Sequence, residues 1–240
     1  DEAHKIEDQI IQFVGFDIFA GQVDECNLNS EKYNFTDLDS MIKLTDDISY
    51  SYAKKIKDII SRIKPDYVFH LAAQALVRKS HLDPLSTFTT NAIGTANILE
   101  CLRLIEKKVI AVFITSDKAY DNVEWIWGYR ENDPLGGKDP YSASKGMAEL
   151  AIKTYFYSYF KDRSDHVTLG IGRAGNVIGG GDYSDNRIVP DYLNALNRKK
   201  KLVLRNPMNV RPWQYVLEPL YGYTLLAKQK YSSKKNTKFG

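Results

Sequence analysis

Two short segments of this chain carry side chains that could act together on an alcohol group. Residues 115–118 read Thr-Ser-Asp-Lys after an apolar stretch, and Tyr141 precedes Lys145 by four positions. Residues four apart on a helix share a face, so the Lys145 ammonium can lie beside the Tyr141 phenol and favour its anionic form. A phenolate placed in this way is suited to take a proton from a sugar hydroxyl.

An alternation of extended and helical segments must position these residues. Apolar stretches predict strands at 67–72, 109–115 and 166–173, and periodic patterns predict helices at 52–63, 84–106 and 141–160. Asp83 followed by Pro84 is a favourable N-cap and first-turn pair for the second of these helices. Strands separated by helices predict an α/β fold with a doubly wound parallel sheet. Because ligands bind beyond the carboxyl ends of such strands, we expect a site built from residues 72–74, 116–118 and 174–176.

The composition is typical of a globular enzyme and argues against several other classes. The chain has 240 residues, of which 43% are hydrophobic and 26% charged, and this suits one large domain, alone or with a small lobe. The net charge is +3 with basic residues spread along the chain, so no nucleic-acid partner is expected. No apolar run is long enough to span a bilayer, so no membrane partner is expected either. The two cysteines, Cys26 and Cys101, lie far apart, which fits a reducing compartment and a cytoplasmic location.

Two features suggest binding sites that their context argues against. Residues 170–175 match the dinucleotide pattern GxGxxG, but they run into a loop-like stretch at 176–182, whereas a true fingerprint opens a helix. We therefore interpret them as a loop that follows a sheet strand. His70 lies in an apolar strand and is interpreted as a hydrogen-bonded core residue, and no spacing of His, Cys or carboxylates indicates a metal site.

Several longer segments carry a family resemblance. They are FHLAAQALV (69–77), FITSDKAYDN (113–122), WGYRENDPLGGKDPYSASK (127–145), GRAGNVIGGGD (172–182) and RNPMNVRPWQYVLEPL (205–220). In this order they resemble the CDP-glucose 4,6-dehydratases, nucleotide-sugar enzymes of the extended short-chain dehydrogenase/reductase superfamily. The resemblance extends over roughly three-quarters of the chain, and several ordered matches are far more specific than Tyr-x-x-x-Lys alone.

The resemblance implies a lyase that runs an internal redox cycle with NAD, in deoxysugar and O-antigen precursor synthesis. Tyr141 would deprotonate the C4 hydroxyl of CDP-glucose, Ser116 would hydrogen-bond the C4 oxygen, and Lys145 would support the phenolate and bind the nicotinamide ribose. Asp117 would protonate the departing C6 hydroxyl. Lys118 stands where dTDP-glucose dehydratases carry a glutamate that removes the C5 proton, so it must be partly neutral, and burial near cations would favour this. This Asp-Lys pairing is itself typical of the CDP-glucose branch.

Further binding residues follow from the resemblance alone. The substrate-binding candidates are Asn176, Arg187 and Arg211, with surface ion pairing as the alternative role for the two arginines. A homodimer through a four-helix contact of residues 84–106 and 141–160 is also implied. The cofactor-binding candidates are Ala72, Ala73 and Gln74 through backbone contacts, together with Asn91, Thr115, Tyr141 and Lys145.

The first 45 residues depart from the family pattern. Their only glycines are Gly15 and Gly21, so they contain no Gly-rich turn to hold the NAD pyrophosphate. We divide the chain into a divergent segment (1–45), a partial NAD-binding domain with the catalytic residues (46–175) and part of a substrate-binding lobe (176–240). A chain lacking both ends of the family domain is expected to bind NAD poorly. The alternatives are another nucleotide-sugar enzyme, either a 4-epimerase or a dTDP- or GDP-sugar dehydratase, or an inactive nucleotide-sugar binding module.

Overall fold

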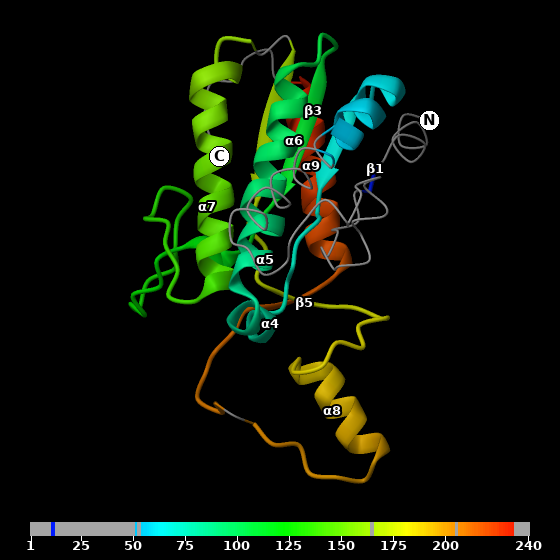
Figure 1. Cartoon of the computed structure of the whole chain (residues 1–240). Coiled ribbons are helices and arrows are strands. Elements are labelled where there is room, and N and C mark those ends of the chain that lie inside the picture. The colour runs from blue at the N-terminus through cyan, green and yellow to red at the C-terminus, as the bar shows by residue number, and fades with distance from the viewer. Residues whose placement is uncertain (1–10, 13–50, 52–53, 164–165, 205, 233–240) are drawn as a thin grey trace, which may run out of the picture.

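The computed structural model describes residues 11–12, 51, 54–163, 166–204 and 206–232 (Figure 1). A helix at 54–63 precedes the strand at 67–70. The strands are β1 (Ile11–Gln12), β2 (Tyr67–His70), β3 (Val109–Ile114), β4 (Val167–Gly172), β5 (Asn176–Ile178) and β6 (Trp213–Tyr215). The helices are α4 (Val77–Leu82), α5 (Pro84–Phe88), α6 (Gly94–Arg103), α7 (Pro140–Tyr155), α8 (Ile188–Asn197) and α9 (Leu217–Ser232). Short helical turns are η2 (Thr89–Ile93), η3 (Asp117–Ala119) and η4 (Phe156–Phe160).

The main sheet is parallel and has the order β1-β2-β3-β4. Ala111 in the middle of β3 pairs with Val68 of β2 on one side and with Leu169 of β4 on the other. Parallel neighbours require crossover connections, and helices provide them between β2, β3 and β4. Strands β5 and β6 form a separate two-stranded parallel ladder. The predicted α/β fold with a parallel sheet is confirmed.

Strand β3 is buried on both faces of the sheet. Val109, Ala111 and Phe113 lie in one apolar cluster with residues of α6, α7 and η4. Ile110 and Val112 lie in a second cluster, where Ala227 of α9 covers the opposite face. Side chains alternate between the faces of a strand, so an unbroken apolar run such as VIAVFI is typical of a sheet covered by helices on both sides. Figure 1 shows α6 and α7 on one side of the sheet and α9 on the other.

The helix predicted at 84–106 begins as expected and then changes its winding. Asp83 caps it, since its carboxylate accepts a hydrogen bond from the amide of Ser86 at 3.1 Å, with Pro84 in the first turn. The π-helical turn η2 then interrupts the α-helical pattern between α5 and α6. Such turns recur at functional sites, and this one contains the buried Asn91. The helix predicted at 141–160 continues through α7 into a second π-helical turn, η4.

Other expectations differ in detail. The three predicted strands are confirmed but end one or two residues earlier, at His70, Ile114 and Gly172. Helix α4 and the β5–β6 ladder were not predicted, since both are short. The expectation that residues 1–45 lack a Gly-rich turn concerns residues outside the described part of the chain. Of these 45 residues, the structure describes the two that form β1.

The glycines of the GxGxxG match serve packing, and the interpretation against a dinucleotide fingerprint is confirmed. Gly170 and Gly172 lie in β4, where a Cβ would come within 2.9 Å of Leu226 and 2.6 Å of Tyr223 on α9. The segment continues into β5 instead of opening a helix. These glycines therefore let α9 approach the sheet closely.

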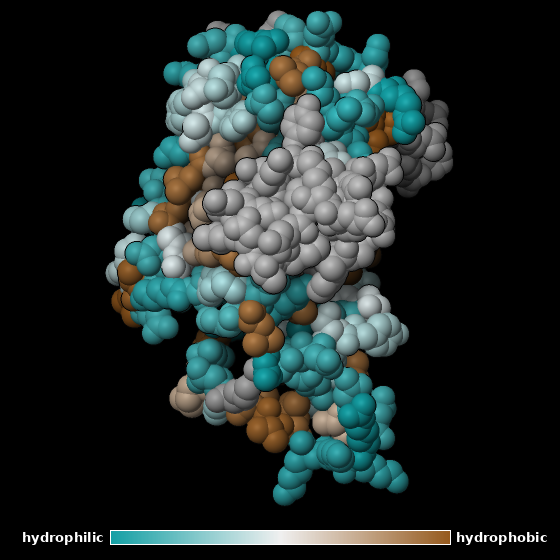
Figure 2. Space-filling view, in the orientation of Figure 1, coloured by the Kyte–Doolittle hydropathy of each residue, from teal (hydrophilic) through white to brown (hydrophobic). Residues whose placement is uncertain are grey.

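Figure 2 shows one surface of the molecule, where polar residues cover most of the coloured area and apolar residues form separate patches. Within the described residues, no helix is long and apolar enough to cross a membrane.

Candidate active site

The segment that follows β3 holds the first group of predicted residues. Its backbone continues to pair with the segment after β4, because Thr115 N–H donates to the carbonyl of Gly172 at 2.9 Å and Asp117 N–H to that of Ala174 at 3.1 Å. Ser116 starts the turn η3 by accepting a hydrogen bond from the amide of Lys118 at 3.2 Å. The carboxyl ends of β3 and β4 thus lie together, as expected for a parallel sheet.

The first turn of α7 is held by caps from several elements. Asp139 accepts a hydrogen bond from the amide of Ser142 at 3.0 Å, and the buried hydroxyl of Ser80 on α4 accepts one from the amide of Tyr141 at 3.2 Å. Ser144 donates to the carbonyl of Tyr141 at 2.7 Å and accepts from the Asn91 amide at 2.8 Å. The position of Tyr141 is therefore set by α4 and η2 as well as by its own helix.

Tyr141 is buried, with 8% of its surface exposed, and its phenol shares a hydrogen bond with the side chain of Ser116. The Ser116 hydroxyl in turn lies 3.0 Å from a carboxylate oxygen of Asp117. Phenol, serine hydroxyl and carboxylate thus form a continuous hydrogen-bonded path. A serine hydroxyl carries one proton and accepts others, so this path can move a proton between Tyr141 and Asp117.

The expectation that Lys145 holds this phenol anionic does not match the electrostatics of the structure. Burial raises the pKa of Tyr141, and the bond to Ser116 opposes that shift only in part. The charged groups that contribute are Asp117, Arg187 and Asp139. Desolvation disfavours the phenolate, so the shift is opposite to the predicted direction.

Lys145 lies on the same face of α7 and is 5% exposed. Its ammonium donates a long hydrogen bond, 3.4 Å, to the carbonyl of Ile114 at the end of β3. Burial lowers the pKa of Lys145 to about 8, and the negative charge of Glu149 opposes this shift. An ammonium has three donors, and the one described bond leaves capacity for hydroxyl oxygens of a ligand.

Lys118 follows the expectation for a lysine that is partly neutral. Burial lowers its pKa, and Arg211 and Arg187 lower it further, whereas Asp139 and Asp117 raise it. The two arginines are thus cations of the kind that the sequence analysis expected near Lys118.

The Lys118 ammonium also lies 5.7 Å from the centre of the Tyr141 ring, within the range of a cation–π contact. Tyr141 of α7 therefore lies beside the segment that follows β3, where Lys118 is located.

The predicted cofactor residues after β2 are already bound to one another. Gln74 N–H donates to Asn91 Oδ1 at 2.8 Å, and Asn91 Nδ2 donates back to the Gln74 carbonyl at 3.0 Å. Both backbone groups of Gln74 are therefore engaged, and Asn91 ties this loop to Ser144 of α7. These bonds define a structural role, while contacts of Gln74 and Asn91 with a cofactor stay a prediction. Ala72 and Ala73 are half-buried beside them.

His70 is the hydrogen-bonded core residue that its strand predicts. The Thr95 hydroxyl donates to the Asn91 carbonyl at 2.7 Å, so it must accept the bond from His70 Nε2 at 3.1 Å. This assigns the proton to Nε2 and leaves Nδ1 as an acceptor. Burial, with a smaller contribution from Lys145, lowers the pKa of His70 to about 3, so the ring is neutral.

The three substrate candidates lie on the segment after β4. Asn176 begins β5, and its amide donates to the carbonyl of Pro212 at 3.1 Å. Arg187 forms a half-exposed ion pair with Asp182 at 3.5 Å. Arg211 is exposed and donates to the carbonyl of Val210 at 3.0 Å. Both arginines act electrostatically on Lys118, so the structure places them near the catalytic candidates.

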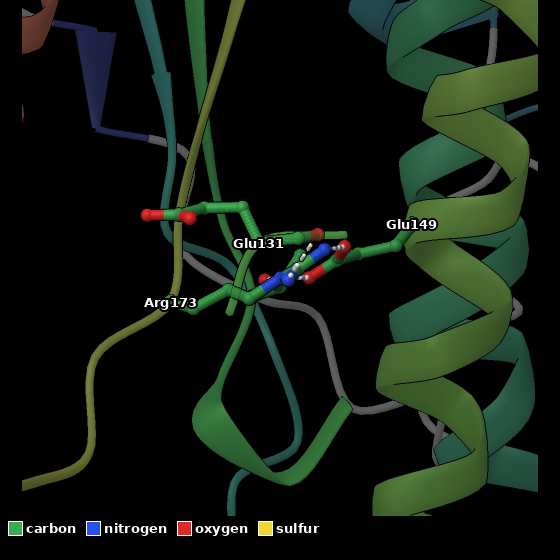
Figure 3. Close-up of polar contacts among 4 residues, drawn as sticks. Glu131, Glu149 and Arg173 are labelled. Atoms are coloured by element: carbon green, nitrogen blue, oxygen red, sulfur yellow. Dashed lines mark hydrogen bonds and ion pairs between the residues drawn. The ribbon is translucent and has the colours of Figure 1, made fainter. Parts of the chain in front are cut away.

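The sequence analysis missed a buried ion pair beside the site (Figure 3). Glu149 of α7 is fully buried, and Arg173 after β4 binds both of its carboxylate oxygens. The sequence contained a signal for Glu149. Tyr141, Lys145 and Glu149 are spaced four residues apart, which puts all three on one helix face. Within the described part of the chain, no group of three or more His, Cys, Asp or Glu residues could hold a metal ion.

Solved structures share this fold. The chain is similar to dTDP-glucose 4,6-dehydratase from Streptomyces venezuelae, solved with NAD bound, with a TM-score of 0.64, 24% identity and coverage of 73% of this chain and 52% of that one. It is also similar to UDP-glucose 4-epimerase from Thermotoga maritima, solved with UDP-glucose, with a TM-score of 0.63, 25% identity and coverage of 72% and 55%. The fold and site thus define a Rossmann-like protein of the short-chain dehydrogenase/reductase class.

Sequence comparison narrows the class. Residues 26–239 match the family described as GDP-mannose 4,6 dehydratase, and the chain belongs to this family. A curated relative, CDP-glucose 4,6-dehydratase from Salmonella typhimurium, is 47% identical over 183 residues, which are 75% of this chain and 51% of that protein. The resemblance seen in the motifs is thereby confirmed. The chain spans about half the length of the curated relatives it matches.

Proposed function

We propose that the protein carrying this chain dehydrates CDP-glucose to CDP-4-keto-6-deoxyglucose, as an NAD-dependent hydro-lyase. The observation that supports this most is the gathering of Tyr141, Ser116, Asp117 and Lys118 at the carboxyl end of β3. An epimerase needs a base for one hydroxyl, whereas a dehydration also needs an acid for the departing hydroxyl and a base at C5. The 47% identity to a CDP-glucose 4,6-dehydratase supports the choice of nucleotide.

Each residue has one role in this proposal. Ser116 hydrogen-bonds the C4 oxygen. Tyr141 takes the proton of the C4 hydroxyl while its own phenol proton passes through Ser116 to the Asp117 carboxylate. Lys118, whose pKa is lowered, removes the C5 proton in its neutral form and returns it to C5 when the hydride reaches C6. Asp117 gives a proton to the C6 hydroxyl, which leaves as water. The products are one water and one 4-keto-6-deoxy sugar, so atoms balance and no net oxidation occurs.

The described residues fit NAD at the edge of the sheet. The carboxyl ends of parallel strands are where dinucleotides bind in such folds, and the buried Lys145 ammonium has donors to spare for ribose hydroxyls. We propose that Lys145, Tyr141, Thr115 and the loop at 72–74 hold the cofactor, with Asn91 fixing that loop. When bound, NAD supplies the hydride chemistry that removes hydrogen from C4 and returns it to C6.

We propose that residues 176–240 form part of the substrate lobe and that residues 46–175 form the NAD-binding part. Arg211 and Arg187 suit the diphosphate because guanidinium groups donate in a planar fork, and Asn176 suits a neutral oxygen nearby. Their electrostatic effect on Lys118 supports placing the diphosphate next to the reacting sugar.

We further propose a homodimer through a four-helix contact. In each copy one helix is the continuous stretch of α5, η2 and α6, and the other is α7. Support comes from exposed apolar side chains on these helices, including Ile93, Met147 and Leu150. A role in deoxysugar and O-antigen synthesis and a cytoplasmic location belong to the same proposal. The location is supported by the low cysteine content.

A substrate comparison tests the proposal. The protein is incubated with catalytic NAD and one of CDP-, dTDP-, UDP- or GDP-linked hexose, and products are separated by chromatography. We expect a 4-keto-6-deoxy product from CDP-glucose with no net NADH. Epimerised UDP-glucose as the main product would replace this proposal by the 4-epimerase alternative. Binding of CDP-glucose without turnover would support the binding module.

A further inference from the structure

Glu149 lies at the centre of a network that joins three parts of the site. Its Oε1 accepts hydrogen bonds from Thr115 Oγ1 and from Arg173 Nε, each at 2.6 Å, while Arg173 Nη2 binds Oε2. Figure 3 shows the Arg173 side chain reaching from the segment after β4 to Glu149 on α7. A single carboxylate therefore connects α7, the end of β3 and the end of β4.

Arg173 extends this network to the segment between η3 and α7. Its Nη1 donates to the backbone carbonyl of Glu131 at 3.0 Å, and its guanidinium lies 4.6 Å from the centre of the Tyr120 ring. Tyr120 stacks in turn on Tyr129, with ring centres 5.0 Å apart. The carboxylate of Glu131 points away from the arginine in Figure 3, so Glu149 is the acid that balances its charge.

The location of Glu149 relates it directly to Lys145. The two residues are four apart on α7, and side chains at this spacing are neighbours on the helix surface. Thr115, which binds Glu149, directly follows Ile114, whose carbonyl accepts the hydrogen bond from Lys145. Glu149 is thus linked to Lys145 both along the helix and through the end of β3.

Few other charged groups face Lys145. Burial lowers its pKa to about 8, and Glu149 is the neighbour that opposes this shift. His70 approaches from β2, but burial keeps its ring neutral by lowering its pKa to about 3. Tyr141 precedes it by one turn with a raised pKa and so is also neutral. Arg173 approaches from the end of β4, and its charge is paired with Glu149.

We propose that Glu149 is a positioning residue: it places a buried carboxylate one helical turn from the Lys145 ammonium, and its bonds to Thr115 and Arg173 align the end of β3 with α7. This inference rests on the proposed function in one respect, that Lys145 belongs to the catalytic group. Glu149 itself touches neither substrate nor cofactor in this account.

The test follows the Lys145 ammonium without substrate or cofactor. The protein is labelled with lysine carrying ¹³C at Cε, and the Lys145 signal is assigned by its loss in Lys145→Arg. We expect a titration midpoint near pH 8 in the unchanged protein. In Glu149→Gln, which keeps the shape but removes the charge, the midpoint should fall by about one unit. The matched control is Glu100→Gln, which removes a partly exposed carboxylate on α6 and should leave the midpoint unchanged.

The direction of the shift separates this role from a merely structural one. If the glutamate only maintained the packing, Glu149→Gln would admit water and the midpoint would rise toward the ordinary value of 10.5. An unchanged or raised midpoint in a folded variant overturns the inference.

If Glu149→Gln does not fold, the double variant Glu149→Gln, Arg173→Met serves instead, because it leaves no unpaired buried charge. A smaller fall in the same direction is expected there, because the double variant also removes the positive charge that is paired with Glu149. A fall of the midpoint in a protein without dehydratase activity would retain this inference and reject the proposed function. Dehydratase activity with an unchanged midpoint would retain the proposed function and reject this inference.

Discussion

The region formed by the end of β3 and the start of α7 differs from the segment between β4 and α9 in how deeply its candidate site residues are buried. In the first region Ser116, Tyr141 and Lys145 are buried and are bonded to groups from several elements. In the second region Arg187 is 39% exposed in a 3.5 Å ion pair, and Arg211 is exposed beside its neighbour's carbonyl. The groups that would move protons are therefore fixed by the fold, whereas the groups that would meet phosphate remain in contact with water.

This difference has a physical reason. Acid–base catalysis depends on short distances and on pKa values set by burial, and both require a packed environment. Binding of a diphosphate depends on charge, which acts over longer distances and does not require burial of the cation beforehand. We therefore expect changes in the buried region to affect rate and stability, and changes in the exposed region to affect affinity.

Removal of the Tyr141 hydroxyl should have the largest effect. In Tyr141→Phe we expect kcat to fall by about 10²–10⁴-fold, because a positioned acid or base contributes this much. The affinity for CDP-glucose, measured by titration calorimetry, should change little because the ring is retained. The exposed Tyr157, just beyond α7, provides a matched control, and Tyr157→Phe should keep its rate. A Tyr141→Phe protein that keeps most of its turnover would exclude the phenol as the base.

Loss of the buried guanidinium should destabilise the fold next most strongly. Arg173→Met leaves the fully buried Glu149 carboxylate without its cation, so the free energy of unfolding in urea should fall by about 3–5 kcal/mol. Arg103→Met, which breaks the partly exposed pair with Glu100, should lower the free energy of unfolding far less. Equal losses in the two variants would contradict the contrast between buried and exposed charges.

Changes in the exposed region should weaken binding and leave the rate nearly intact. Arg211→Ala is expected to reduce the affinity for CDP by about 1.5–3 kcal/mol, the range for hydrogen bonds to charged groups. Arg187→Ala should cost about 1 kcal/mol or less, since this arginine already shares a surface ion pair. Calorimetry with CDP measures both, with Arg198→Ala as an exposed control at the end of α8. A large loss of kcat with unchanged affinity would assign Arg211 to the buried machinery instead.

A further comparison concerns the dependence of stability on pH. The pKa of Lys145 falls from 10.5 to about 8 on folding, so below pH 8 the buried ammonium lowers stability. Between pH 8 and 10.5 the folded form has released this proton while the unfolded form retains it, so stability should rise with pH. Thermal unfolding of the unchanged protein should therefore gain relative to Lys145→Met across this window. A flat difference would mean that Lys145 is not desolvated.

Local patterns in the sequence predicted much of the buried region. The apolar runs identify β2, β3 and β4, and the cap at Asp83 identifies the start of α5, because these signals depend on neighbouring residues only. The spacing of Tyr141 and Lys145 places both on one face of α7 for the same reason.

Contacts between distant segments could not be predicted in the same way. Glu149 and Arg173 are 24 residues apart, and Ser80 and Tyr141 are 61 apart, so their meeting depends on how elements pack. The pKa of Tyr141 was expected to be low from spacing alone, but burial raises it, and burial is a property of the assembled fold. The residues between β4 and α9 gave few local signals, and the β5–β6 ladder was missed.

The fate of one hydrogen atom tests the central claim most directly. CDP-glucose carrying deuterium at C4 is supplied with catalytic NAD, and the product is analysed by NMR and mass spectrometry. We predict a 4-keto-6-deoxy sugar with the deuterium at C6, because the proposed cycle returns the same hydride to the same molecule. Deuterium that remains at C4 of a hexose with inverted C4 configuration would contradict the account and identify an epimerase.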